Sequence, residues 1–272
     1  MPSSPFSNRM AIDTQALGAP TKASPWIASG LIVMTSTDYL YRDDLAEVHI
    51  AGYGFHWEGA APMILEWLRQ HGLHDGLMVD LGCGGGQWLA TAAAAGYETV
   101  GIDVSAAMIQ RAKRNSPTTK FICESFADAD IPDCDVVTSL GEPLNYLNSG
   151  PLMQRTIKNV FRSLRTDGLF IFDVRHPPSK PVASINHVRN DDDWFCYARI
   201  EENAKRLTRH ITTFRKVGAH FRRADEVHRL KLFPRAEMLT WLRGVGFRVR
   251  VSRSYGDYEL TKRQSVFLCR KP

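Results

Sequence analysis

Residues 77–86 read LMVDLGCGGG, and this stretch decides the fold. An apolar run ends at Asp80 and turns through closely spaced glycines, after which residues 87–95 carry a helical pattern. A strand, a glycine turn and a helix in this order bring a ligand against the free backbone N–H groups at the start of the helix. The stretch therefore predicts the first strand of a parallel sheet, with a ligand site at the carboxyl end of that strand.

Short apolar runs and helical patterns alternate on both sides of this turn. Ahead of it, Ala61, Ile64, Leu65 and Leu68 recur at helical spacing, with Pro62 in the first turn. Strands that alternate with helices imply right-handed crossovers and a parallel sheet covered on both faces. The predicted fold class is therefore α/β, a doubly wound Rossmann-like sheet. After the first strand, the predicted strands are residues 98–104, 120–123, 135–140 and 168–174, and the predicted helices are residues 105–114 and 151–164.

The pattern changes after Pro177 and Pro178, where polar and apolar side chains alternate without intervening helices. This alternation is typical of half-buried antiparallel strands, so we expect an antiparallel β insertion at about residues 183–233. Its predicted strands are residues 194–200, 207–216 and 220–233. A helix at residues 235–245 and two strands at residues 248–254 and 265–270 close the chain.

The domain organisation follows from these patterns. We expect residues 38–272 to form one domain, with the insertion inside it. Residues 1–37 are rich in Ser, Pro, Ala and Thr without sustained periodicity, and we expect them to be a disordered N-terminal extension. An alternative is that translation begins at Met34.

Composition excludes several classes of protein. The chain has 272 residues, of which 44% are hydrophobic and 23% charged, so it is long enough to bury a sizeable core. No run approaches the roughly 18 apolar residues that a membrane-spanning helix requires, so no membrane partner is expected. The five cysteines are odd in number and form no C-x-x-C pair, so we expect no disulfide framework, no metal site and a reducing, cytoplasmic location.

Charge is distributed unevenly along the chain. Residues 1–198 hold 15 Lys and Arg against 22 Asp and Glu, whereas residues 199–272 hold 19 against 7. A basic C-terminal region of this size could attract nucleic acid or another anion. The alternative is that these charges form the solvated face of amphipathic strands, because Arg and Lys alternate there with apolar residues.

A second acidic residue supports a nucleoside site. Asp103 ends the second predicted strand, 19 residues after Gly84, where a carboxylate can accept hydrogen bonds from a ribose diol. A dinucleotide-binding turn requires Gly or Ala where Gln87 stands, and Asp80 would repel a pyrophosphate but suits a ligand with an ammonium group. The pattern therefore predicts a nucleoside without a pyrophosphate and leaves a nicotinamide-dependent oxidoreductase as a distant alternative.

Two motifs carry a resemblance to a known family. VDLGCGGG at residues 79–86 and VGIDVS at residues 100–105 resemble the first and second motifs of the class I S-adenosylmethionine-dependent methyltransferases. The resemblance implies S-adenosyl-L-methionine as cofactor and a seven-stranded sheet of order 3-2-1-4-5-7-6 with the last strand antiparallel. The cofactor-binding residues that it implies are Asp80, Gly82, Cys83, Gly84, Gly86, Asp103, Val104, Met108, Ser125, Phe126 and Leu140.

In this family the first acid and the glycine turn hold the methionine part of the cofactor, and the second acid holds the ribose. Val104 and Met108 would flank the adenine. The family often carries an Asp for the adenine amine where this chain has Ser125, with Glu124 as a competing candidate.

The acceptor side is predicted from the loops that follow the fourth and fifth strands. Glu142 and His176 lie in these loops, and either could accept a proton from an amine or hydroxyl acceptor. Tyr53 belongs to an aromatic segment that folds over the cofactor in similar enzymes. Glu142, His176 and Tyr53 are therefore the candidate catalytic residues. In similar small-molecule enzymes an insertion after the fifth strand covers the acceptor.

The sequence thus predicts a methyltransferase that modifies nitrogen or oxygen of a small molecule. The loop SLGE at residues 139–142 lacks the Asn/Asp-Pro-Pro-aromatic motif of enzymes that methylate DNA base amines. Two alternatives stay open: an RNA or protein methyltransferase that docks through the basic C-terminal region, and a non-catalytic cofactor-binding accessory subunit. The oligomeric state is not predicted.

Overall fold

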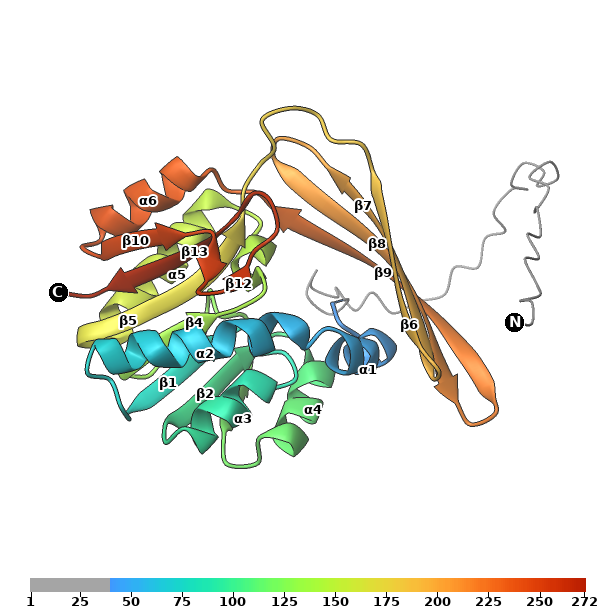
Figure 1. Cartoon of the computed structure of the whole chain (residues 1–272), viewed down its shortest axis with the longest axis horizontal. Coiled ribbons are helices and arrows are strands. Elements are labelled where there is room, and N and C mark those ends of the chain that lie inside the picture. The colour runs from blue at the N-terminus through green and yellow to red at the C-terminus, as the bar shows by residue number, and fades with distance from the viewer. Residues whose placement is uncertain (1–39) are drawn as a thin grey trace, which may run out of the picture. The chain divides into compact units, whose positions relative to one another are not determined.

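The computed structural model describes residues 40–272 (Figure 1). The predictions for residues 1–37, including a start at Met34, fall outside the described residues. No helix among residues 40–272 is long and apolar enough to cross a membrane.

A central sheet of seven strands carries the fold. Its strands are β1 (Leu77–Leu81), β2 (Glu98–Asp103), β3 (Lys120–Cys123), β4 (Cys134–Ser139), β5 (Leu164–Arg175), β10 (Arg248–Ser252) and β13 (Gln264–Arg270). They lie in the order β10-β13-β5-β4-β1-β2-β3, and β13 pairs antiparallel with both of its neighbours. With β10 and β13 counted as the sixth and seventh strands, this is the order 3-2-1-4-5-7-6, so the predicted fold is confirmed.

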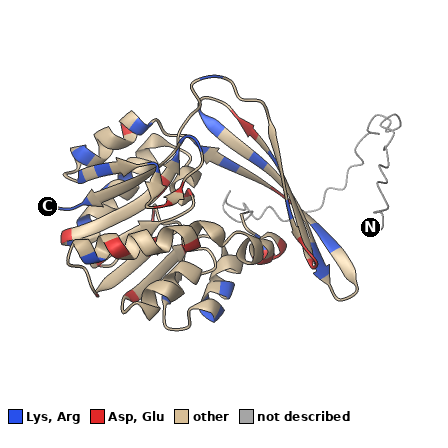
Figure 2. Ribbon diagram, in the orientation of Figure 1, with Lys and Arg blue, Asp and Glu red and all other residues tan. Residues whose placement is uncertain are grey.

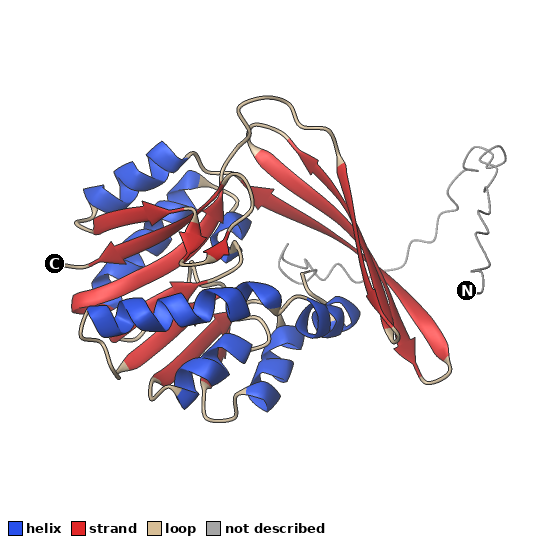
Figure 3. Ribbon diagram, viewed as in Figure 1, coloured by secondary structure: helices blue, strands red, loops and turns tan. Residues whose placement is uncertain are grey.

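Helices cover both faces of this sheet (Figure 3). Alternate residues of β5 separate the two faces: Phe170 and Phe172 pack with α5 and α6, whereas Leu169 and Ile171 pack with α2 and α3. This burial of both faces explains why the strands read as continuous apolar runs. The helices are α1 (Asp43–Gly52), α2 (Phe55–Gln70), α3 (Gln87–Ala94), α4 (Ala106–Asn115), α5 (Gly150–Ser163) and α6 (Arg235–Gly244), with a 3₁₀ helix η1 (Pro143–Tyr146).

The insertion after β5 is a separate antiparallel sheet of four strands (Figure 1). Its strands are β6 (Ile185–Asp191), β7 (Trp194–Glu202), β8 (Arg206–Val217) and β9 (His220–Lys231). The predicted insertion is confirmed, but β6 was not predicted. Every residue of β6 is exposed, so its sequence carries no alternation of buried and exposed positions.

One face of the insertion packs on α1. Trp194 and Cys196 of β7 and Ile211 of β8 form a cluster with Leu45 and Val48 of that helix. This contact attaches the insertion to the N-terminal part of the described chain.

A single buried side chain joins the two ends of the insertion. The Nδ2 amide of Asn145, in η1, donates to the carbonyl oxygens of Arg175 at 3.0 Å and Lys231 at 2.6 Å. Arg175 ends β5 and Lys231 ends β9, so the chain enters and leaves the insertion at one place.

The N-terminal helices differ from the sequence prediction. Helix α1 was not predicted, and α2 begins at Phe55, so Pro62 lies inside the helix rather than in its first turn. Burial of Ala60, Ala61 and Ile64 on the sheet outweighs the hydrogen bond that Pro62 cannot make. A short hairpin of β11 (Ser254–Tyr255) and β12 (Tyr258–Glu259) also escaped prediction, because each strand has only two residues.

Candidate functional site

The glycine turn after β1 has a backbone conformation and close neighbours that residues with a side chain would not tolerate. Gly82, Gly84 and Gly86 have φ values of 76°, 52° and 72°. A Cβ atom on Gly82 would lie 2.4 Å from the Pro143 side chain, and one on Gly86 would lie 3.0 Å from Ala112. Gly84, by contrast, faces open space. The turn therefore presents its backbone at Gly84 to an open region, as a ligand would require.

Asp103 ties this turn to the start of α4. Its Oδ2 accepts the backbone N–H of Gly84 at 2.9 Å, and its Oδ1 accepts that of Ser105 at 2.8 Å. Burial raises the pKa of Asp103 above its ordinary value, although these two N–H groups oppose the rise. The carboxylate thus lies at the carboxyl end of β2 and keeps lone pairs for a further donor.

Asp80 is a buried acid beside the same turn. Its Oδ1 accepts the hydroxyl of Thr138 at 2.7 Å, and the Thr138 oxygen in turn accepts the indole N–H of Trp88 at 3.1 Å. Burial, together with the charges of Asp103 and Asp173, raises the pKa of Asp80 to about 7, against the opposing Thr138 hydrogen bond. A positively charged group placed nearby would restore its full ionisation.

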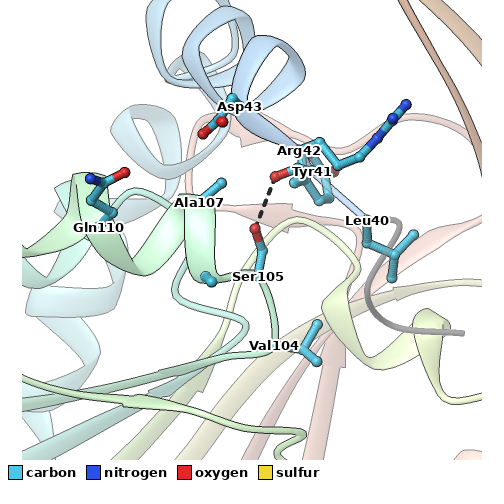
Figure 4. Close-up of a pocket in the computed structure, with 9 residues that line it drawn as sticks. Leu40, Tyr41, Arg42, Asp43, Val104, Ser105, Ala107 and Gln110 are labelled. Atoms are coloured by element: carbon cyan, nitrogen blue, oxygen red, sulfur yellow. Dashed lines mark hydrogen bonds between the residues drawn. The ribbon is translucent and has the colours of Figure 1, made fainter. Parts of the chain in front are cut away.

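A pocket of about 490 Å³ borders this region (Figure 4). It lies between the segment that precedes α1 and the first turn of α4. Val104 and Ser105, which follow Asp103 directly, contribute to its wall. The lining residues are Leu40, Tyr41, Arg42, Asp43, Val104, Ser105, Ala106, Ala107 and Gln110.

The other residues implied for the cofactor lie around the turn with different exposure. Cys83 and Met108 are buried. Leu140 is partly buried against the cluster of α2 and α3, and Phe126 against that of α5 and α6. Ser125 Oγ accepts the backbone N–H of Ala127 at 3.3 Å in the turn after β3.

Asp173 organises the loop after β4. Its carboxylate accepts the backbone N–H groups of Gly141 and Glu142 at 3.0 and 2.9 Å and the hydroxyl of Tyr255 at 3.0 Å. His56 completes the set, with its Nε2 3.0 Å from Asp173 Oδ2. Burial raises the pKa of Asp173, but the charge of His56 and these hydrogen bonds lower it more, so the net pKa lies below its ordinary value.

His56 is correspondingly more basic than an ordinary imidazole. Burial lowers its pKa, but the charge and hydrogen bond of Asp173 raise it further, and the net direction is upward. Its Nδ1 lies 3.2 Å from the hydroxyl of Tyr258. His56 also lies beside Gly141, because a Cβ there would be 3.6 Å from its ring. An acid–base group therefore stands at the end of β4.

Glu142 is held by residues from three other strands. Its Oε2 accepts Arg209 of β8 at 2.6 Å, its Oε1 accepts the side-chain amide of Gln264, and the guanidinium of Arg175 lies 3.8 Å away. Its backbone is left-handed, with a φ of 69°, and the side chain is buried. The sequence prediction placed Glu142 at this rim, and the structure adds that its charge is paired.

His176 makes separate contacts. Its Nδ1 lies 2.8 Å from the carbonyl oxygen of Phe233. A carbonyl only accepts, so Nδ1 carries the proton and the neutral ring has its lone pair on Nε2, which is buried without a hydrogen-bond partner. Burial and the charge of Arg235 lower the pKa of His176 against the hydrogen bond to Phe233, so the ring favours this neutral form.

Tyr53 contacts residues of α1 and of the insertion. Its ring stacks on His49 at 5.5 Å between centroids, and the guanidinium of Arg189 from β6 lies 5.1 Å from the ring centre. Burial and the neighbouring thiol of Cys196 raise the pKa of its phenol. Tyr53 thus packs at the junction of α1 with the insertion.

Sequence analysis did not identify three residues of this region as site residues: His56, Asp173 and Arg209. Asp173 carried a signal, since a charged residue interrupts the apolar run from Phe170 to Val174. His56 lies within the aromatic segment that sequence analysis singled out, but nothing local indicates its partner. Arg209 is one of many basic residues in the insertion, and only the fold shows that it reaches Glu142.

The chain is similar to known methyltransferases. Residues 78–168 match a family model described as a methyltransferase domain. A relative from Bacillus subtilis (strain 168), named "Putative methyltransferase YqeM", is 28% identical over an alignment of 210 residues that covers 71% of this chain and 83% of that protein.

Solved structures share the fold. The sugar N-methyltransferase KedS8 from Streptoalloteichus matches with a TM-score of 0.71 and 17% identity over 93% of this chain and 99% of that one. CalS10 from Micromonospora echinaspora, an amino pentose methyltransferase solved with S-adenosylmethionine bound, matches with a TM-score of 0.70 and 19% identity over 83% and 96%.

Proposed function

Because the chain carries a class I S-adenosylmethionine-dependent methyltransferase domain, we propose that it transfers the methyl group of that cofactor to nitrogen or oxygen of a small molecule. The observation that carries this proposal is the contact between Arg209 and Glu142. Through it, the insertion reaches the loop after β4, where ligands of parallel sheets bind. An acceptor bound there would lie under a second sheet, which favours a small molecule. The sugar N-methyltransferases of similar fold support this acceptor class.

The residues around the glycine turn fit the cofactor. Asp80 is a buried acid that a ligand ammonium would hold in its ionised form, and Gly84 opens its backbone to a ligand. In this proposal Asp80 and the turn at Gly82, Cys83, Gly84 and Gly86 hold the methionine part. Asp103 holds the ribose, and the adenine is flanked by Val104, Met108, Ser125 and Phe126, with Leu140 beside the methionine part.

The acceptor-side residues take different roles. Glu142 is already paired with Arg209, so we assign it to orienting the insertion rather than to accepting a proton. His176 offers the Nε2 lone pair of a neutral ring, and the phenol of Tyr53 stays protonated. His56 joins them as a fourth candidate, because it lies beside Gly141.

Methyl transfer mainly requires that the acceptor atom, the methyl carbon and the sulfur of the cofactor be aligned. When bound, S-adenosylmethionine supplies an electrophilic methyl group on a sulfonium that leaves as a neutral thioether. The chain contributes by fixing the loop after β4 through Asp173 and by covering the acceptor with the insertion, so that water is excluded. Such positioning contributes several kcal/mol to catalysis. The acceptor proton leaves to a nearby base or to solvent.

The test uses S-adenosylmethionine labelled in its methyl group, with panels of small amines, small alcohols, total RNA and denatured protein. We expect label on a small molecule, with stoichiometric S-adenosylhomocysteine. Label on RNA or protein alone would refute the proposed acceptor. Cofactor binding with no transfer to any panel would instead favour an accessory subunit.

The RNA or protein alternative rests on the basic C-terminal region (Figure 2). Part of this positive charge is neutralised by ion pairs within the molecule. Arg209 pairs with Glu142, and Arg215 and Arg222 pair with Asp44. The exposed remainder on α6 and β10 is the surface that this alternative would use: Arg235, Arg243, Arg248 and Arg250. Salt-sensitive RNA binding would support it.

A further inference from the structure

The segment Leu40–Arg42, here called the strap, precedes α1 and lines the pocket beside α4. Tyr41, in its centre, has a left-handed backbone with a φ of 49°. A bulky residue in this conformation is strained, and such strain persists only where surrounding contacts impose it. The strap is therefore held in place by the rest of the molecule.

Glu226 of the insertion holds the strap from one side. Its Oε2 accepts the backbone N–H of Tyr41 at 2.8 Å, and its Oε1 accepts that of Arg42 at 2.9 Å. The Glu226 side chain is only 2% exposed. His228 Nε2 lies 2.9 Å from Glu226 Oε2, and His228 Nδ1 lies 2.8 Å from the hydroxyl of Tyr146. A buried carboxylate in the insertion is thus committed to two N–H groups of the strap.

Ser105 holds the same residue from the other side. Its hydroxyl donates to the carbonyl oxygen of Tyr41 at 2.9 Å (Figure 4). Ser105 also begins α4, and its backbone N–H binds Asp103 at 2.8 Å. Tyr41 therefore connects the insertion, through Glu226, with the acid that we assign to the ribose.

The Tyr41 side chain adds contacts to the same connection. Its ring lies edge-on to His228 at 4.8 Å and to His49 at 4.9 Å between centroids. Its hydroxyl lies 3.4 Å from that of Tyr146, in the 3₁₀ helix that follows Glu142. The strap thus touches the insertion, the loop after β4 and α4 at once.

We propose that Glu226 is a positioning residue of the cofactor site: it closes the strap over the adenosine end of the bound cofactor and so links the insertion to cofactor exchange. The inference rests on the cofactor placement proposed above. The strap and Val104 line one pocket, so opening the contact between Glu226 and Tyr41 would speed the entry and release of the cofactor at this end.

If Glu226 only stabilised the fold, its substitution would change the melting temperature but not the rate of cofactor exchange. Glu202 provides a matched control, because it is also a buried glutamate of the insertion, 3% exposed, and it pairs with Arg175 and Arg263 away from the strap. Glu226→Gln keeps the size of the side chain but leaves one strap N–H without an acceptor oxygen.

The experiment measures dissociation of S-adenosylhomocysteine by stopped flow in the full chain. We expect Glu226→Gln to speed dissociation roughly tenfold, the effect of losing one hydrogen bond to a charged group. Glu202→Gln should lower the melting temperature without changing this rate. A wild-type dissociation rate in Glu226→Gln, with a lower melting temperature, would overturn the inference.

A second measurement uses the wild-type protein and does not depend on a variant that folds. Saturating S-adenosylhomocysteine should slow hydrogen–deuterium exchange at the amides of Tyr41 and Arg42 at least several-fold. Unchanged exchange would refute the proposal. If the wild-type protein binds no S-adenosylhomocysteine, the cofactor placement itself is wrong and the inference falls with it, whereas binding without methyl transfer to any acceptor removes only the proposed acceptor reaction.

Discussion

His56 and Asp173 form an ion pair that joins the first turn of α2 to the end of β5, with Nε2 and Oδ2 3.0 Å apart. The histidine side chain is 17% exposed and the aspartate is fully buried. The same carboxylate holds the backbone of the loop after β4, so the pair sets both a charge and a loop conformation beside the proposed acceptor site.

Asp173→Asn should lower the pKa of His56, because it removes the negative charge that raises it. The variant should also lose about 3 kcal/mol of stability. Because the pKa of His56 is raised in the folded protein, protonated His56 stabilises the fold fully below pH 6.5, the ordinary pKa of the group. This contribution to stability is lost as the pH rises through the folded pKa. Because the pKa of Asp173 is lowered in the folded protein, ionised Asp173 stabilises the fold fully above pH 3.8, the ordinary pKa of the group. This contribution to stability is lost as the pH falls through the folded pKa.

Urea unfolding and NMR titration check both statements. The stability difference between wild type and Asp173→Asn should be larger at pH 5.5 than at pH 9, and the His56 ring should titrate at lower pH in the variant. An equal difference at both pH values would mean that the charge of His56 contributes nothing.

Cofactor affinity should depend on pH through Asp80. Its pKa of about 7 means that the acid is mostly protonated below neutral pH, whereas a ligand ammonium favours the carboxylate. Affinity for S-adenosylhomocysteine should rise roughly tenfold from pH 5.5 to 7, a range in which the α-ammonium of the ligand stays charged. Calorimetry on wild type and Asp80→Asn measures this, and the variant should bind weakly without the pH trend. A trend that persists in Asp80→Asn would assign it to another group.

Asp103→Ala should weaken cofactor binding by about 1–3 kcal/mol, the range for losing charge-assisted hydrogen bonds. The matched control is Asp128→Ala, an exposed acid that pairs with Arg155 after β3. Calorimetric titration of both folded variants decides the matter. Unchanged affinity in Asp103→Ala would exclude the ribose assignment.

Glu142→Gln should destabilise the fold by about 3 kcal/mol, because Arg209 is left half-buried without its partner. Turnover should fall while cofactor affinity is retained. A double-mutant cycle with Arg209→Gln separates the two roles assigned to Glu142. Strong coupling in both stability and turnover supports an orienting role, whereas a turnover loss independent of Arg209 would point to proton transfer.

His176→Asn keeps an amide donor for the carbonyl of Phe233 and removes the Nε2 lone pair. If His176 takes the acceptor proton, kcat should fall at least tenfold with unchanged affinity for S-adenosylhomocysteine. Steady-state kinetics measure kcat once an acceptor is identified from the labelled panels. Full activity would show that His176 does not take the acceptor proton, and His56 would remain as the candidate imidazole on the acceptor side.

The central sheet could be predicted from sequence because its signals are local. Buried parallel strands read as apolar runs, and the turn at Gly82 to Gly86 needs left-handed backbone that glycine supplies. Strand β6 left no such signal, since all its residues are exposed. Helix α1 was missed because its buried side chains pack on Trp194, Cys196 and Ile211, which lie far along the chain.

The site was only half visible for a related reason. Asp80 and Asp103 sit at the ends of strands next to a glycine turn, so neighbours in sequence identify them. The partners of Asp173 come from 117 residues earlier, at His56, and 82 residues later, at Tyr255. Sequence shows an acid in an apolar run but not which distant side chains neutralise it.

The two hydrogen bonds that Asn145 donates at the ends of the insertion have an evolutionary consequence. Because one amide holds both Arg175 and Lys231, the two ends of the insertion are fixed at one place beside the central sheet. Side chains of the insertion outside its contacts with α1, the strap and Glu142 can therefore change without shifting the register of β5 or the turn at Gly84. New acceptor preferences can thus arise by substitutions in the insertion while the glycine turn and its two acids stay the same.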